Sequence, residues 1–89
     1  MNVNERVKLI KEVIVFLDTK TILCKCVDNN TILATKKFYS CSCLDKKCKH
    51  IEALKELLKA YLEKNNELLK MFKIKKKNGM LILTKRARV

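Results

Sequence analysis

Apolar residues near the start of the chain recur at intervals of three and four, which is the spacing of one face of an α-helix. They are Val7, Ile10, Val13, Ile14 and Leu17, and Asn4 precedes them at a position suited to cap the first turn. The pattern predicts a helix from about residue 4 to residue 17. The β-branched residues 13–15 are also typical of extended structure, so the end of this helix stays open to that alternative. Asp18-Thr19-Lys20 predicts a turn.

The next pattern predicts a β-hairpin. Residues 21–27 and 31–39 are rich in Thr, Ile, Val and aromatic side chains, and Asp-Asn-Asn at 28–30 separates them. Asparagine tolerates the positive φ that a tight hairpin requires. We expect the second strand to run directly into Cys41 and Cys43, where alternation along an extended chain directs both sulfurs to one side.

A helix and a second hairpin are predicted in the rest of the chain. The helical period resumes after Lys49 and is carried by Ile51, Leu54, Leu57, Leu58, Tyr61 and Leu62, with Leu68, Leu69 and Phe72 as a possible extension. Asn78-Gly79 lies between two extended runs and is a strong hairpin signal. Ile74, Leu81 and Leu83 are candidates for the apolar face of that hairpin.

Length and composition favour a single domain over residues 1–89. The chain has 89 residues, is 48% hydrophobic, and contains one glycine and no proline. The predicted fold is a small α+β domain: N-terminal helix, β-hairpin, metal knot, long helix and basic C-terminal hairpin. Its longest apolar run, 13–17, is far too short to cross a bilayer, and no signal sequence opens the chain. We therefore expect a soluble, intracellular protein of the cytoplasm, nucleoid or nucleus.

Four soft ligands are concentrated in the segment C-S-C-L-D-K-K-C-K-H. They are Cys41, Cys43, Cys48 and His50, the only histidine of the chain. Structural Zn²⁺ takes four Cys or His ligands in a tetrahedron, so this spacing predicts a zinc site that folds locally around its ion. A disulfide framework is disfavoured by the odd number of cysteines and the neighbouring histidine. If His50 binds metal, its other ring nitrogen should contact a carbonyl, a carboxylate or water.

The order of strand, Cys-X-Cys, short loop, Cys-X-His and helix resembles the SWIM zinc finger. The likeness covers roughly residues 21–62, is carried by Cys41, Cys43, Cys48 and His50, and includes the step Lys49-His50-Ile51 into the helix. Asp45-Lys46-Lys47 stands where many members have glycine or proline. The resemblance implies binding of DNA or of other proteins rather than catalysis. It also implies adaptors for recombinase-like partners.

Cys24 and Cys26 form a second Cys-X-Cys within the first predicted hairpin. The main interpretation is that they are small buried hydrophobes, since free cysteine is among the most buried residue types. A two-residue turn at Asn29-Asn30 would pair Cys26 with Leu33 and Cys24 with Thr35, away from Cys41. The alternative is a second metal shared across a dimer.

Positive charge is concentrated at the C-terminal end. The net charge is +12, and residues 70–89 carry eight cations and no acid. Such a surface favours a polyanion as partner, and nucleic acid is the commonest one, although a solubilising lysine-rich face is the alternative. Because 18 lysines stand against three arginines, we expect phosphate contacts with weak sequence preference. The candidate contacts are Lys70, Lys73, Lys75, Lys76, Lys77, Lys85, Arg86 and Arg88.

Enzymatic function is not expected. Four protein ligands fill the shell of a tetrahedral zinc and leave no position for an activated water. The glutamates at 52, 56, 63 and 67 fall at helical spacings, as on a solvated face. Two functions stay open. One is a nucleic-acid binder, with DNA ahead of RNA. The other is a protein-interaction adaptor, such as a recombination or repair accessory subunit or a small regulator, or a homodimer, acting through the N-terminal helix or the apolar stripe of residues 51–62. Neither membrane nor small-molecule substrate is expected.

Overall fold

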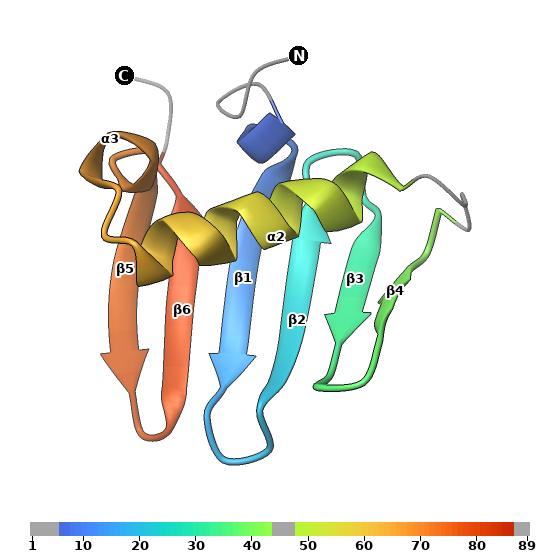
Figure 1. Cartoon of the computed structure of the whole chain (residues 1–89), viewed down its shortest axis with the longest axis horizontal. Coiled ribbons are helices and arrows are strands. Elements are labelled where there is room, and N and C mark those ends of the chain that lie inside the picture. The colour runs from blue at the N-terminus through green and yellow to red at the C-terminus, as the bar shows by residue number, and fades with distance from the viewer. Residues whose placement is uncertain (1–5, 44–47, 87–89) are drawn as a thin grey trace.

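Six strands form one antiparallel sheet, and a long helix packs across one of its faces (Figure 1). The computed structural model describes residues 6–43 and 48–86. The strand order is β4-β3-β2-β1-β6-β5. The strands are β1 (Ile10–Phe16), β2 (Thr21–Cys26), β3 (Thr31–Ala34), β4 (Tyr39–Cys41), β5 (Phe72–Lys77) and β6 (Met80–Lys85), and the helices are α2 (Lys49–Leu62) and α3 (Asn66–Leu69). The fold is therefore a small, compact α+β domain.

The predicted N-terminal helix is wrong, because residues 10–16 form β1 in the interior of the sheet. The register against β2 shifts between Ile10 and Glu12, so β1 carries a bulge at this point. The bulge lets Ile10 and Val13, three residues apart, both face the core, where each is fully buried. Buried residues three positions apart are also typical of a helix, which is why the sequence pattern predicted one. Asn4, the expected cap, lies outside the described residues.

The first predicted hairpin is present, but its second strand is divided. β2 and β3 pair as expected, and the chain then turns at residues 35–38 before β4 pairs back onto β3. Thr35 closes this turn: its Oγ1 accepts hydrogen bonds from the backbone N–H groups of Lys37 and Phe38, at 3.2 and 3.3 Å. Cys41 therefore lies on a separate edge strand.

The C-terminal hairpin agrees with its prediction. β5 and β6 pair from Phe72–Lys85 to Lys77–Met80, which leaves Asn78 and Gly79 as the turn. Gly79 has φ +78°, a value that L side chains rarely adopt. The hairpin is part of the main sheet, because β6 also pairs with β1.

Helix α2 ends at Leu62, so the possible extension through Leu68, Leu69 and Phe72 is not part of it. Lys64 takes a positive φ of 56°, which stops the helix, and the Asn65 side chain then caps the single turn of α3. Phe72 begins β5 and is buried under the helices rather than on one of them. In the described part of the chain, no helix is both long and apolar enough to cross a membrane.

The core lies between α2 and the face of the sheet that it covers. Val13, Cys24, Ile32 and Leu83 come from four strands and are at most 1% exposed. Leu54 and Leu57 meet them from α2 and are fully buried. The helix thus closes the buried hydrophobic core over this face of the sheet.

Replacing a core leucine of α2 should destabilise the domain far more than replacing an exposed one. Leu57 is fully buried, whereas Leu62 at the end of the same helix is 80% exposed. We expect Leu57→Ala to lower the free energy of unfolding by about 2–5 kcal/mol, and Leu62→Ala by less than about 0.5 kcal/mol. Urea unfolding followed by circular dichroism measures both, and equal losses would contradict the assigned core.

Candidate metal centre

Three cysteines and one histidine meet where the end of β4 faces the first turn of α2. Cys41 is the last residue of β4 and Cys43 follows two residues later. Cys48 is the N-cap of α2, and its sulfur accepts a hydrogen bond from the Ile51 backbone N–H at 3.4 Å. His50 is the second residue of the helix and is 4% exposed. The sheet and the helix therefore each contribute to the cluster.

The four side chains bring their possible ligand atoms close enough together to share one metal ion. All four lie within 4.8 Å of one another. The Cys43 and Cys48 sulfurs are 3.4 Å apart, and His50 Nδ1 is 3.5 Å from Cys48 Sγ and 3.7 Å from Cys41 Sγ. Ordinary Zn–S and Zn–N bond lengths in a tetrahedron give S···S and S···N separations of roughly 3.8 and 3.6 Å. The cluster is consistent with a zinc-binding site.

Asp28 orients the histidine ring. Its Oδ2 lies 2.7 Å from His50 Nε2, while Nδ1 faces the sulfurs. This is the carboxylate–histidine arrangement that fixes the tautomer and the ring plane of metal-binding histidines. The predicted partner for the second nitrogen is thus a carboxylate, and the geometry assigns Nδ1 to the metal side. Nothing in the local sequence pairs residue 28 with residue 50, so sequence reasoning missed Asp28.

The loop that carries Asp28 is tied to the cysteine segment. The Asn30 backbone N–H donates to Asp28 Oδ1 at 3.2 Å. Ser42, between two ligands, donates through its hydroxyl to Asn30 Oδ1 and accepts from the Thr31 N–H, both at 2.9 Å. The loop and the Cys-X-Cys segment therefore hold each other in position, and Asp28 is presented to His50 by this network.

The ionisation of these groups follows from burial and from the Asp28–His50 contact. Burial raises the pKa of the Cys41 thiol to about 12, so this sulfur needs a nearby cation to become a thiolate. The hydrogen bond from His50 lowers the pKa of Asp28 to about 2. For His50, burial opposes the charged form, but the hydrogen bonds to Asp28 and Cys43 outweigh it and raise its pKa.

Cys24 and Cys26 lie closer to the cluster than the predicted register allowed. That register is wrong, because Cys24 pairs with Ile32 and Ile32 pairs with Cys41. The hairpin loop has three residues: the Cys26 N–H bonds to the Asn30 carbonyl at 2.8 Å, and Asn29 takes a φ of 71°. As a result Cys26, Asp28 and His50 also have ligand atoms within 4.8 Å of one another.

Burial agrees with the interpretation of these two cysteines as core residues. Cys24 is fully buried and Cys26 is 2% exposed. Burial raises the pKa of the Cys26 thiol to about 11, and that of Cys24 further still. Burial therefore favours the neutral thiol at both positions.

The predicted cationic residues do not form one patch. Lys73, Lys75 and Lys77 are exposed on β5 and point to the face of the sheet that α2 leaves uncovered. Lys76 and Lys85 pair with Leu81 and Phe72, so they lie at the margins of the opposite face. Lys70 and Arg86 are exposed at the ends of α3 and β6, and Arg88 lies outside the described residues.

Comparison with protein-family models, curated proteins and solved structures finds no match for this chain. The likeness to SWIM zinc fingers rests on ligand spacing and element order, and it assigns no family. The loop at residues 44–47, where this chain differs from many SWIM sequences, lies outside the described residues. The established feature is the Cys41, Cys43, Cys48 and His50 cluster.

Removing one ligand should abolish stoichiometric metal binding. We expect purified protein to contain one zinc per chain, and Cys43→Ser to lose it together with much of its thermal stability, because structural zinc supplies folding energy. Cys24→Ala is the matched control, since it removes a buried sulfur outside the cluster. Elemental analysis and the absorption of Co²⁺-substituted protein measure both. Retained stoichiometric metal in Cys43→Ser would contradict the assignment.

Removing the carboxylate behind His50 should weaken metal binding without abolishing it. Loss of such a partner typically lowers metal affinity 10–100-fold, so we expect about this decrease for Asp28→Asn. Asp18→Asn makes the same change in the β1–β2 turn and should leave the affinity unaltered. Competition with a chromophoric zinc chelator gives both affinities, and equal values for the two variants would show that Asp28 does not position the ring.

Proposed function

We propose that this protein is a non-enzymatic zinc-binding domain that binds nucleic acid, DNA ahead of RNA, largely through phosphate contacts. The observation that carries the proposal is the charge of β5 and its surroundings. Residues 70–89 contain eight cations and no acid, and the four lysines of β5 are all exposed. A polyanion is the partner that such a surface attracts most strongly.

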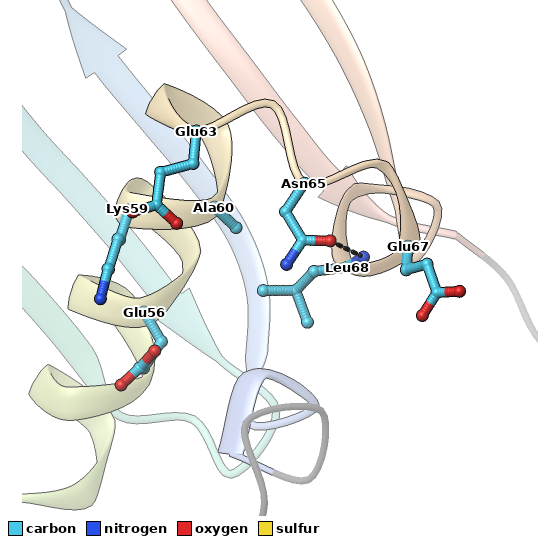
Figure 2. Close-up of a pocket in the computed structure, with 7 residues that line it drawn as sticks. All are labelled: Glu56, Lys59, Ala60, Glu63, Asn65, Glu67 and Leu68. Atoms are coloured by element: carbon cyan, nitrogen blue, oxygen red, sulfur yellow. Dashed lines mark hydrogen bonds between the residues drawn. The ribbon is translucent and has the colours of Figure 1, made fainter.

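The position of several acidic residues on the helical layer supports a binding surface on the strand side of the molecule. A hollow between α2 and α3 gathers carboxylates on the helical layer (Figure 2). It is lined by Glu56, Lys59, Ala60, Glu63, Asn65, Glu67 and Leu68. Asn65 Oδ1 is occupied by the Leu68 N–H, and Glu56 forms an ion pair with Arg6 at 3.6 Å. Three carboxylates against Lys59 and Arg6 leave this hollow slightly acidic, so it attracts a polyanion less than the strand side does.

The metal centre has a structural role in this proposal. The Cys3His set would hold Zn²⁺ with four protein ligands, which closes the coordination shell and leaves no position for a reactive water. β4 and β5 are opposite edges of the sheet. The ion would therefore secure α2 against the sheet at one edge, while the phosphate contacts lie at the other.

The protein-interaction alternative has less surface available than the sequence implied. The N-terminal helix that it invoked is replaced by β1. In the apolar stripe of α2, Leu54 is fully buried, and Ile51, Leu58 and Tyr61 pack against the same core. Leu62 alone among these is largely exposed, at 80%. We therefore favour the nucleic-acid proposal.

Binding should depend steeply on salt and on the lysines of β5. If about six phosphates are neutralised, log K on duplex DNA should fall with log salt with a slope near −5. Replacing Lys75, Lys76 and Lys77 with glutamine should weaken binding and reduce the slope by about 2 on duplex and about 1.4 on single strands, because two of the three lysines, Lys75 and Lys77, share one face of β5. Mobility shifts over a salt series with single-stranded, duplex and branched DNA measure this.

A second triple variant controls for net charge. Lys36 and Lys37 are exposed in the β3–β4 turn, and Lys59 is exposed on α2, in the helical layer. Their replacement by glutamine removes the same charge and should change the slope little. Salt-independent binding, or no binding to any of the three DNA forms, would refute the proposed function.

A further inference from the structure

The face of the sheet opposite α2 is uncovered by any described helix (Figure 1). Its exposure differs clearly from that of the covered face. Val13 and Leu83 face α2 and are at most 1% exposed, whereas their neighbours Ile14 and Ile82 are only half-buried and Leu33 is 44% exposed. We call the second surface the open face. Its strand residues include Glu12, Ile14, Phe16, Leu23, Lys25, Leu33, Lys73, Lys75, Lys77, Met80, Ile82 and Thr84.

Strand register arranges the open face in three rows, of which two run from apolar residues to a lysine and the third, Thr31-Lys25-Glu12-Thr84-Lys73, is polar. In one row, Leu33 pairs with Leu23, Leu23 with Ile14, Ile14 with Ile82, and Ile82 with Lys75. In the next row, Phe16 pairs with Met80 and Met80 with Lys77. Side chains paired directly across an antiparallel sheet lie on the same face. Two rows of the open face therefore form an apolar platform, and three lysines border the face on β5.

A shallow hollow follows this border. It is lined by Glu12, Lys73, Lys75, Lys77, Ile82 and Thr84. Alternate residues on a strand are about 6.6–6.8 Å apart, a repeat comparable with that of phosphates along an extended nucleic-acid strand. Glu12, opposite Thr84 in the row of Lys73, is the one acid among the described strand residues of this face.

This combination fits one class of partner better than the others. A second copy of the chain would bring its own lysine border to a face that already repels positive charge, in a protein of net charge +12. Duplex DNA turns its base faces inward and would leave the apolar rows uncovered. A single strand offers both phosphates and exposed base faces, which matches a charged border beside an apolar platform.

We infer that the open face binds single-stranded nucleic acid, with phosphates along Lys73, Lys75 and Lys77 and bases against Phe16, Ile14 and Ile82. This rests on the proposed function and adds to it the face and the strandedness. Contact with base faces tolerates any base, so sequence preference should be weak. The metal centre at the β4 edge is not part of this surface.

Two pairs of variants on the β5–β6 hairpin test whether the open face binds the single strand. Ile82 and Ile74 are both half-exposed isoleucines, but Ile82 lies on the open face and Ile74, paired with Leu83, lies on the other. Lys75 and Lys76 are adjacent and also point to opposite faces. The probes are a short labelled single-stranded DNA of mixed sequence and the duplex formed with its complement, measured by fluorescence anisotropy over a salt series.

We expect the open-face variants to be the sensitive ones. Ile82→Thr should weaken single-strand binding by about fivefold, because it removes apolar area that a base would cover, while Ile74→Thr leaves it nearly unchanged. Lys75→Gln should reduce the salt slope on single strands by about 0.7, and Lys76→Gln should reduce it less. The wild-type protein should bind the single strand more tightly than the duplex.

A variant that is expected to bind more tightly distinguishes an effect on binding from an effect on folding. Glu12→Gln removes the acid beside the lysine border and should tighten single-strand binding by about twofold or more, a result that misfolding cannot produce. Glu63→Gln on the helical layer removes the same charge and should have little effect.

The outcomes separate the two proposals. Salt-dependent binding in which both members of each pair behave alike, or in which duplex is preferred, would refute the open-face inference and leave the proposed function standing. No salt-dependent binding to either probe would refute both. A wild-type dimer in sedimentation that Ile82→Thr converts to a monomer, with DNA binding unchanged, would instead assign the open face to a second copy and overturn the inference.

Discussion

The junction between the end of β4 and the first turn of α2 keeps the two layers of this domain together. α2 is the only long helix of the described chain, and its buried leucines close the core over the sheet. Its N-terminus is held by Cys48 and His50, which face Cys41 and Cys43 across the layers. In a chain of 89 residues a core alone is marginally sufficient, so a cluster that links helix to sheet adds to the contacts that keep the helix docked.

The hairpin loop between β2 and β3 makes that junction specific. Asp28 reaches His50 from the loop, and Asn30 bonds to Ser42 between two of the candidate ligands. The three-residue loop with Asn29 at positive φ places both contacts at once. A shift of register would move Asp28 away and also turn Cys24 and Ile32 out of the core, so cluster and sheet specify each other.

The parts of the structure that sequence predicted are those with local signals. The four ligands, the start of α2 at Lys49 and the Asn78-Gly79 turn each depend on residues close together in the chain. β1 was misread because its bulge places Ile10 and Val13 on one face with helical spacing. The division of β3 from β4 depends on a single threonine turn, and the Asp28–His50 contact joins residues 22 positions apart. The open face could not be foreseen without the strand order.

The open face is uncovered because the described chain has one long helix and a sheet with two faces. Helix α2 has 14 residues and is about 21 Å long, while six strands at their usual spacing span about 24 Å. One helix therefore suffices for one face, and the described chain supplies no second long helix for the other. β1 and β6 are interior strands whose outward residues Ile14, Phe16 and Ile82 are nevertheless apolar. Selection for solubility alone favours polar residues at such positions, as in other one-sided antiparallel sheets. Apolar side chains at these positions, in register with the lysines of β5, fit the proposed partner, which is both apolar and anionic.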